Sequence, residues 1–219
     1  MKGLLIKDFK LMKNQKSFFI ILLVICVAFI NMDSGENFIL GFFTFICSLF
    51  CVTTISYDEF DNGNAFLFTL PFTRSTYVWE KYCLGLLTGT FAWLIAFVMA
   101  TAAWIMKSPG ENFMTQWLPE CVVILLIDWI VLALMIPFQL KFGAERSRFA
   151  MLIAFGAIFL LVLLGGQLLS LLKVDLTGID RMMTGAGGIG ILSACLAAGL
   201  ICLALSFSIS KRIVEKKEF

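Results

Sequence analysis

The chain has 219 residues, of which 60% are hydrophobic and only 15% are charged, and its formal net charge is +2. Soluble globular domains carry about 25% charged residues, so this composition excludes an ordinary soluble domain. The chain contains no histidine, which excludes HExxH zinc sites, histidine general bases and Ser-His-Asp triads. The apolar residues occur in blocks long enough to cross a bilayer, so we expect an integral membrane protein.

Residues 1–16 form the first candidate element. Five lysines occur in this stretch, and its apolar residues share one face of a helix drawn through it: Leu4, Leu5, Ile6, Phe9 and Met12. This amphipathic pattern is typical of a helix that lies in the membrane interface. We therefore predict an interfacial helix, and the competing interpretation is a disordered basic tail. No small-residue cleavage pattern follows, so we do not interpret the stretch as a removable signal peptide.

Six apolar blocks follow in chain order. They cover residues 17–32, 38–57, 77–106, 119–140, 149–172 and 185–210. A helix rises 1.5 Å per residue, so about 20 apolar residues cross the hydrocarbon core of a bilayer. The sequence therefore predicts an all-α membrane protein with six transmembrane helices, in which residues 1–219 form a single transmembrane domain.

The basic residues divide unevenly between the two sides of such a bundle. Six spans place both termini on one side, and 14 of the 17 lysines and arginines lie in segments on that side. Cytoplasmic segments of membrane proteins are enriched in lysine and arginine. We therefore predict a multi-pass protein of the bacterial cell membrane with both termini in the cytoplasm.

The segment 58–76 and the start of the next span interrupt the apolar pattern with polar residues. Three acids come first, an aromatic run and a Leu-Pro break follow, and an arginine and a Glu-Lys pair come last. The residues that we expect to serve a cytosolic partner are Asp58, Glu59, Asp61, Gly63, Phe66, Phe68, Leu70, Pro71, Arg74, Glu80 and Lys81. We predict that this segment stays in water, contains a short helix from Phe66 to Phe72, and docks onto that partner.

Two features stand out inside the apolar blocks. Gly85, Gly89 and Ala96 belong to a stripe of small residues that favours close helix packing, either within the chain or between subunits. Asp128 is the ionisable residue deep inside a block, and Glu120 lies eight residues earlier on roughly the same helix face. A carboxylate at this depth either lines a pathway or is protonated and hydrogen-bonded to a neighbouring helix.

Nucleotide-binding motifs do not fit this chain. Residues 185–190 match the letters of GxGxxG, but no strand precedes them, so we interpret them as glycines for helix packing or a helix bend. The sequence has no GxxxxGK[ST] loop. We therefore expect this chain to bind no cofactor and no metal, and any ATP and Mg²⁺ to lie on another chain.

The region from Tyr57 to Tyr82 resembles the signature region of small bacterial ABC-2 type permeases. The resemblance lies in Tyr57-Asp58-Glu59, in the glycine and aromatic run from Gly63 to Thr69, in Leu70-Pro71-Phe72-Thr73-Arg74 and in Lys81-Tyr82. The loop after the fourth block resembles the second cytoplasmic turn of these permeases, with Lys141, Glu145 and Arg146 as its candidate contact residues.

The resemblance implies the ABC-2 fold of type V-like exporters, with an elbow helix over residues 1–16 and a coupling helix within 58–76. It also implies two copies of a cytosolic ABC ATPase and a second permease, identical or paralogous. Among the members of this permease family, this short chain is similar to permeases that export amphipathic, membrane-active peptides such as phenol-soluble modulins or that confer resistance to antimicrobial peptides. We expect an amphipathic peptide or lipid-like cargo, contact with membrane lipid, and no nucleic acid.

Two other functions stay open from the residues alone. An intramembrane lipid-modifying enzyme would need polar groups clustered at one membrane depth, and Asp128 and Glu120 are the candidates for such a cluster. An immunity or scaffold protein would act by binding, without ATP. Dependence on an ATPase partner separates both from a transport subunit.

Overall fold

A computed structural model describes residues 2–30, 32, 35–60, 63–107, 113–171 and 187–217 of the chain. All regular structure within these residues is helical, which confirms the predicted all-α class for this part. The helices are α1 (Lys2–Asn14), α2 (Lys16–Phe29), α3 (Gly35–Glu59), α4 (Gly63–Leu67), α5 (Arg74–Lys107), α6 (Leu118–Leu171) and α8 (Gly187–Lys216), with a π-helical turn over Phe113–Trp117.

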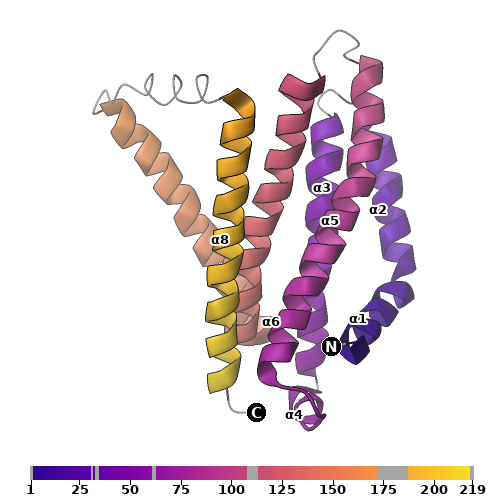
Figure 1. Cartoon of the computed structure of the whole chain (residues 1–219), viewed down its shortest axis with the longest axis vertical. Helices are drawn as coiled ribbons and strands as arrows, with labels where there is room; N and C mark the ends of the chain where they lie inside the picture. Colours follow the sequence, from indigo (N-terminus) through magenta and orange to yellow (C-terminus); the bar gives the residue numbers. More distant parts are fainter. Residues whose placement is uncertain are drawn as a thin grey trace.

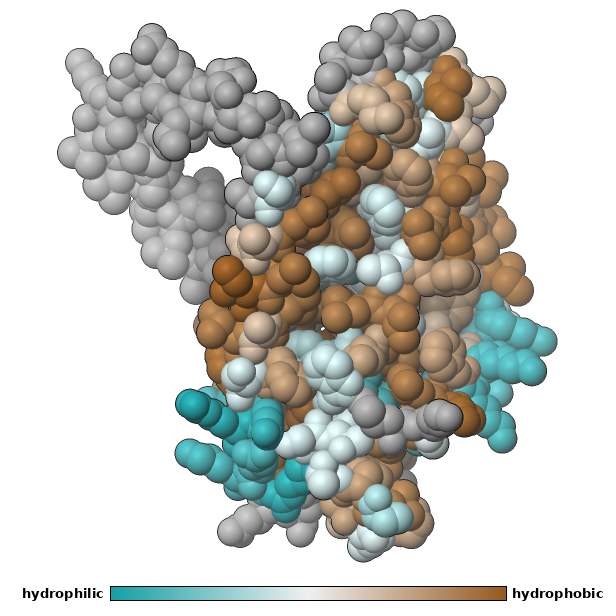
Figure 2. Space-filling model, viewed as in Figure 1, coloured by the Kyte–Doolittle hydropathy of each residue, from teal (hydrophilic) through white to brown (hydrophobic). Residues whose placement is uncertain are grey.

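The short helix α4, the start of α1 and the end of α8 lie at the same end of the bundle, which we call the α4 end (Figure 1). On the face shown in Figure 2, hydrophilic residues gather towards this end, and a broad hydrophobic surface covers the helices above it. On α5, large apolar side chains such as Phe91 and Val98 are exposed. Lipid is the medium that suits such a surface, so the molecule has the polarity of a membrane protein.

Four of the described helical segments are long and apolar enough to cross a membrane: Gly35–Glu59, Arg74–Lys107, Leu118–Gly143 and Leu196–Lys216. A fifth is obtained if α1 and α2, which meet at a bend of 61°, count as one broken span. This confirms several membrane-spanning helices. The total of six spans, the interfacial position of α1 and the cytoplasmic location of the termini stay predictions.

The predicted stripe of small residues packs α5 against its neighbours within the chain. A Cβ atom added at Gly85 would lie 3.4 Å from Cys51 of α3, and one added at Gly89 would lie 2.6 Å from Oγ of Ser48. Ala96 is fully buried in a second hydrophobic cluster further along α5. Without a side chain at Gly89, the backbone of α5 approaches α3 closely, as small residues allow between helices in lipid.

The helix α6 consists of two arms that meet at Gly143. Gly143 has φ +74° and ψ 177°, a conformation that is essentially restricted to glycine. The first arm corresponds to the predicted block 119–140. The backbone of the second arm stays helical to Leu171, and the last residue of the predicted block 149–172 lies outside the described residues. Beyond Gly143 the second arm turns back towards the opposite end of the bundle (Figure 1).

Candidate functional site

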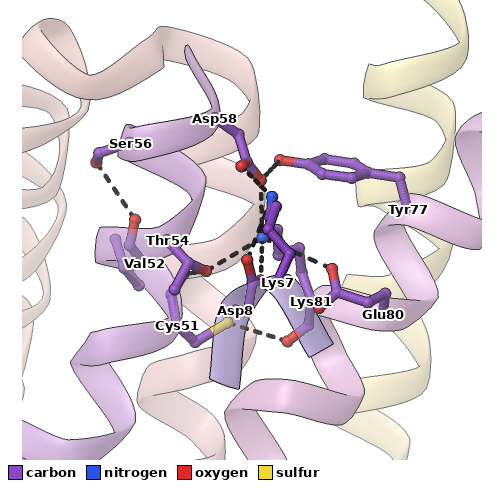
Figure 3. Close-up of polar contacts among 10 residues, drawn as sticks. All are labelled: Lys7, Asp8, Cys51, Val52, Thr54, Ser56, Asp58, Tyr77, Glu80 and Lys81. Atoms are coloured by element: carbon purple, nitrogen blue, oxygen red, sulfur yellow. Dashed lines mark hydrogen bonds and ion pairs between the residues drawn. The ribbon is translucent and has the colours of Figure 1, made fainter. Parts of the chain in front are cut away.

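A largely buried group of charged side chains joins α1, α3 and α5 (Figure 3), with Lys7 half-buried at its edge. We call it the ion cluster; its members are Lys7, Asp8, Asp58, Glu80 and Lys81. Nζ of Lys81 lies 2.5 Å from Oδ2 of Asp8 and 2.8 Å from Oδ2 of Asp58. The same ammonium group donates a hydrogen bond of 3.1 Å to Oγ1 of Thr54. Lys81 is therefore the central cation that links helices far apart in the sequence.

Further contacts complete the ion cluster. Lys7 donates a hydrogen bond from α1 to Oδ1 of Asp58, and the hydroxyl of Tyr77 donates one of 3.2 Å to Oδ2 of the same carboxylate. Oε2 of Glu80 lies 3.6 Å from Nζ of Lys81, within ion-pair distance. Asp8, Glu80 and Lys81 have no exposed side-chain surface. Together these contacts fasten the N-terminal helix to the bundle.

The electrostatics of the ion cluster depend on mutual neutralisation, because three carboxylates face two ammonium groups. Burial by itself raises the pKa of Asp8, but Lys81 and Lys7 outweigh that effect, so the pKa of the Asp8 carboxyl lies below its ordinary value. Removing one partner from a buried ion pair leaves an uncompensated charge and is strongly destabilising. The ion cluster therefore has a structural role, and we expect removal of the Lys81 ammonium group to destabilise the fold.

The burial of these charges corrects the prediction that the whole polar segment stays in water. Asp58, Glu80 and Lys81 are 8%, 0% and 0% exposed, so they offer no surface to a partner protein. The reason is that opposite charges from α1, α3 and α5 compensate one another inside the bundle. Asp8, which completes the set, is not among the predicted site residues.

Arg74 also binds within the chain. Its Nη1 donates hydrogen bonds to the backbone carbonyls of Val214, Glu215 and Lys217, at 3.1, 2.8 and 2.8 Å. Val214 and Glu215 lie in the last turn of α8 and Lys217 directly follows it, and the last carbonyls of a helix lack partners within the helix. Arg74 thus caps α8 and fixes the C-terminal segment beside the start of α5, and its predicted role in coupling to an ATPase stays a prediction.

The short helix of the segment lies earlier than predicted. It covers Gly63–Leu67 instead of Phe66 to Phe72, and a turn follows, in which the amide of Leu70 bonds to the carbonyl of Leu67. Proline removes an amide donor and disfavours a helical residue before it, so Pro71 excludes a regular helix that continues to Phe72. Asp61 lies outside the described residues.

The outward surface of this segment is apolar. Phe60, Phe66 and Leu70 are 72%, 72% and 42% exposed, and Pro71 is exposed beside them. Two neighbours point inward: Leu67 is buried, and the ring of Phe68 lies edge-on to Tyr77 at 5.5 Å. We call Phe60, Phe66 and Leu70 the apolar tip. Of these, Phe60 is not among the predicted site residues, although its aromatic side chain directly follows Glu59 in a polar stretch.

The predicted second cytoplasmic loop lies next to the segment. Glu59 accepts a hydrogen bond of 3.0 Å from Nζ of Lys217, and Lys217 also reaches the carbonyl of Leu140 at 3.2 Å. A Cβ atom at Gly143 would lie 3.2 Å from Oε2 of Glu59. Two predicted contact residues of this loop, Lys141 and Arg146, are exposed, and the side chain of Glu145 lies outside the described part.

The two acids predicted to lie within the membrane differ in burial, because Asp128 is buried between α3 and α6 whereas Glu120 is exposed. Oδ2 of Asp128 accepts a hydrogen bond of 2.7 Å from Oγ of Ser48, and the residue is 4% exposed. Glu120, at the far end from α4, accepts a bond of 3.4 Å from Nδ2 of Asn37. Among the described residues these acids do not form one cluster, so the geometry gives no support to an intramembrane enzyme that uses both together.

The chain belongs to the ABC-2 family of transporter proteins, because the model of that family matches residues 3–215. It is thus the membrane subunit of an ABC transporter, the part that does not itself hydrolyse ATP. Membership of this family implies that the chain works with an ABC ATPase. Searches among curated proteins and among solved structures find no match.

Proposed function

We propose that this chain forms the transmembrane pathway of an ATP-driven exporter of amphipathic, membrane-active peptides, such as phenol-soluble modulins or antimicrobial peptides. Two permease chains, identical or paralogous, would pair in the bacterial cell membrane. Two cytosolic ATPase subunits would bind at the α4 end and hold ATP and Mg²⁺. The lysine and arginine distribution supports a cytoplasmic position of this end.

The observation that carries the proposal is the apolar tip. Exposed phenylalanines are costly in water, and aromatic side chains are frequent anchors of protein interfaces. Phe60 and Phe66 are each 72% exposed at the end of the bundle where hydrophilic residues gather, not in the apolar band that suits lipid. A groove on a cytosolic subunit would cover them.

The helix α5 would carry movement from the tip into the membrane. It begins at Arg74, directly after the segment, and continues for 34 residues. The ion cluster joins its first turns to α1 and α3, so a push on the tip would move three helices together. ATP binding shifts the balance of inward-open and outward-open states only if the ATPases bind one state better than the other.

Co-purification with the cognate ABC ATPase tests the docking surface. Phe66→Ala removes an exposed aromatic anchor without disturbing the core, and we expect ATPase binding to weaken by about 2 kcal/mol, or roughly 30-fold. The matched control is Phe91→Ala, since Phe91 is 66% exposed but lies in the apolar band on α5. Equal binding by the wild type and by Phe66→Ala would contradict docking through the tip.

Reconstituted transport tests the cargo. Permease and ATPase in proteoliposomes should move a fluorescent amphipathic helical peptide in the presence of ATP, and a scrambled peptide without an apolar face should stay behind. A variant of the ATPase that binds but does not hydrolyse ATP separates transport from binding alone. Transport that persists with this variant would favour a binding protein that acts without ATP.

A further inference from the structure

An apolar groove with one carboxylate in it runs between α3 and α6. Its volume is about 530 Å³, within the range of small-molecule sites. The lining side chains come from both helices: Phe45 on α3, and Ile124, Ile127 and Val131 on α6, with Asp128 among them. Asn37 also lines the groove and donates a hydrogen bond to Glu120, so a second acid lies beside the end of the groove that is far from α4.

Asp128 is only half satisfied in this groove. Ser48 donates to Oδ2, whereas Oδ1 is buried and has no hydrogen-bond partner among the described residues. No lysine or arginine is within ion-pair distance of Asp128 in this part of the chain. Buried carboxylates elsewhere in the molecule, such as Asp8 and Asp58, have ammonium partners.

Gly89 makes room for this arrangement. A Cβ atom at Gly89 would lie 2.8 Å from Oδ2 of Asp128 and 2.6 Å from Oγ of Ser48. The absence of a side chain on α5 therefore lets Ser48 and Asp128 meet, which holds one carboxylate oxygen in place, while the other oxygen is buried without a hydrogen-bond partner among the described residues. Three helices contribute to this geometry, so the acid is positioned by the fold.

We infer that the groove between α3 and α6 binds a protonated amine carried on an apolar scaffold, with Asp128 receiving the ammonium group. The charge of the ligand complements a carboxylate that has no cationic partner among the described residues, and its apolar part complements the phenylalanine, isoleucine and valine side chains. Glu120 would attract the ammonium group at the end of the groove that is far from α4. This inference rests on the proposed function, since it names the chemical class of the cargo.

Ligand binding to the permease alone tests the inference without requiring transport. Radiolabelled dodecylammonium is titrated against purified permease in nanodiscs, with empty nanodiscs subtracted, and dodecanol serves as the uncharged probe. We expect Asp128→Asn, which keeps the shape of the side chain, to weaken dodecylammonium binding at least tenfold and to leave dodecanol binding unchanged. Glu215→Gln, an exposed acid at the α4 end, is the control and should bind both as the wild type does.

A measurement on the wild type covers the case in which Asp128→Asn does not fold. A hydrophobic carbodiimide modifies carboxyl groups in apolar surroundings, and mass spectrometry quantifies the adduct on Asp128. Dodecylammonium should protect Asp128 from modification, and dodecanol should not. Equal protection by both probes, or equal binding of dodecylammonium to wild type and Asp128→Asn, would overturn the inference.

Competition identifies the scaffold. A lysine-bearing amphipathic peptide should displace dodecylammonium, and the same peptide with norleucine at its lysines should not, if the amine comes from a peptide. Displacement by long-chain amines but by neither peptide would keep the amine site and reject peptide cargo. A permease that binds amines but never pairs with an ATPase would leave this inference standing while the proposed function failed.

Discussion

Two parts of the region between α3 and the first turns of α5 reverse the usual distribution of residues. The charged residues Asp58, Glu80 and Lys81 are buried, whereas the aromatic residues Phe60 and Phe66 are exposed. Charged side chains are almost never fully buried unless they are paired, and exposed apolar clusters commonly mark contact sites. The difference indicates that the charges of this region hold the bundle together. The exposed Phe60 and Phe66 are the side chains that we propose as the contact surface for a partner.

The two parts should therefore respond differently to substitution. A change in the ion cluster should damage the fold, and any loss of partner binding should follow from that damage. A change at the apolar tip should leave the fold intact and affect only the partner. Two results would contradict this assignment of roles: a change in the ion cluster that affects only partner binding, or a change at the apolar tip that unfolds the bundle.

The largest effect is expected for Lys81→Met. This change leaves Asp8, Asp58 and Glu80 around an apolar side chain, with Lys7 as the one remaining cation of the cluster, and should cost about 3–5 kcal/mol of stability. Thermal unfolding of the purified permease in detergent measures it. Lys211→Met, at a lysine whose side chain is 45% exposed, is the control and should change little.

A second substitution sharpens this result. Asp8→Asn in the Lys81→Met background removes one of the stranded negative charges, so the double variant should regain part of the lost stability. Additive losses from the two substitutions would show that Asp8 and Lys81 do not act as a pair.

The next largest effect is expected for Gly143→Ala, next to the buried part. The change places a Cβ atom where φ is +74° and 3.2 Å from Oε2 of Glu59, and such strain costs about 1–3 kcal/mol. Thermal unfolding again reports the loss. Gly156→Ala on the second arm of α6, where a Cβ atom would meet nothing within 4 Å, should not destabilise the permease.

The smallest effect is expected for Arg74→Met, between the two parts. Losing the cap of α8 should cost about 1 kcal/mol and raise hydrogen exchange in the last turn of α8 roughly fivefold. Arg212→Met changes an exposed arginine of the same turn and should leave exchange as it is. Unchanged exchange in Arg74→Met would show that the cap does not hold the C-terminal segment.

The helices were largely predictable because their lengths follow directly from apolar blocks. The predicted block 38–57 corresponds to α3 over Gly35–Glu59, and 77–106 corresponds to α5 over Arg74–Lys107. Pairings across the bundle were not predictable in this way. Asp8 and Lys81 are 73 residues apart, and Asp8 is a single acid within a basic stretch. One signal was available, because Leu4 and Asp8 are four residues apart and share the buried face of α1.

The candidate site also contains residues that local sequence could predict and residues whose roles depend on distant parts of the chain. Phe66 and Leu70 could be proposed from the sequence because local turn signals bracket them, and they are exposed in the structure. The capping role of Arg74 could not be predicted, since it depends on carbonyl groups 140 to 143 residues away. A sequence shows which residues are polar, but only the packing of distant helices determines which of them are buried and bonded to partners within the chain.

The most direct test of the central claim places a photo-reactive amino acid at Phe66 and, separately, at Phe91, in cells that express the permease with its ABC ATPase. Ultraviolet light should cross-link position 66 to the ATPase and leave position 91 without that product. Cross-linking to the ATPase at neither position, or labelling of position 66 by a reagent confined to the outside of the cell, would contradict docking through the apolar tip.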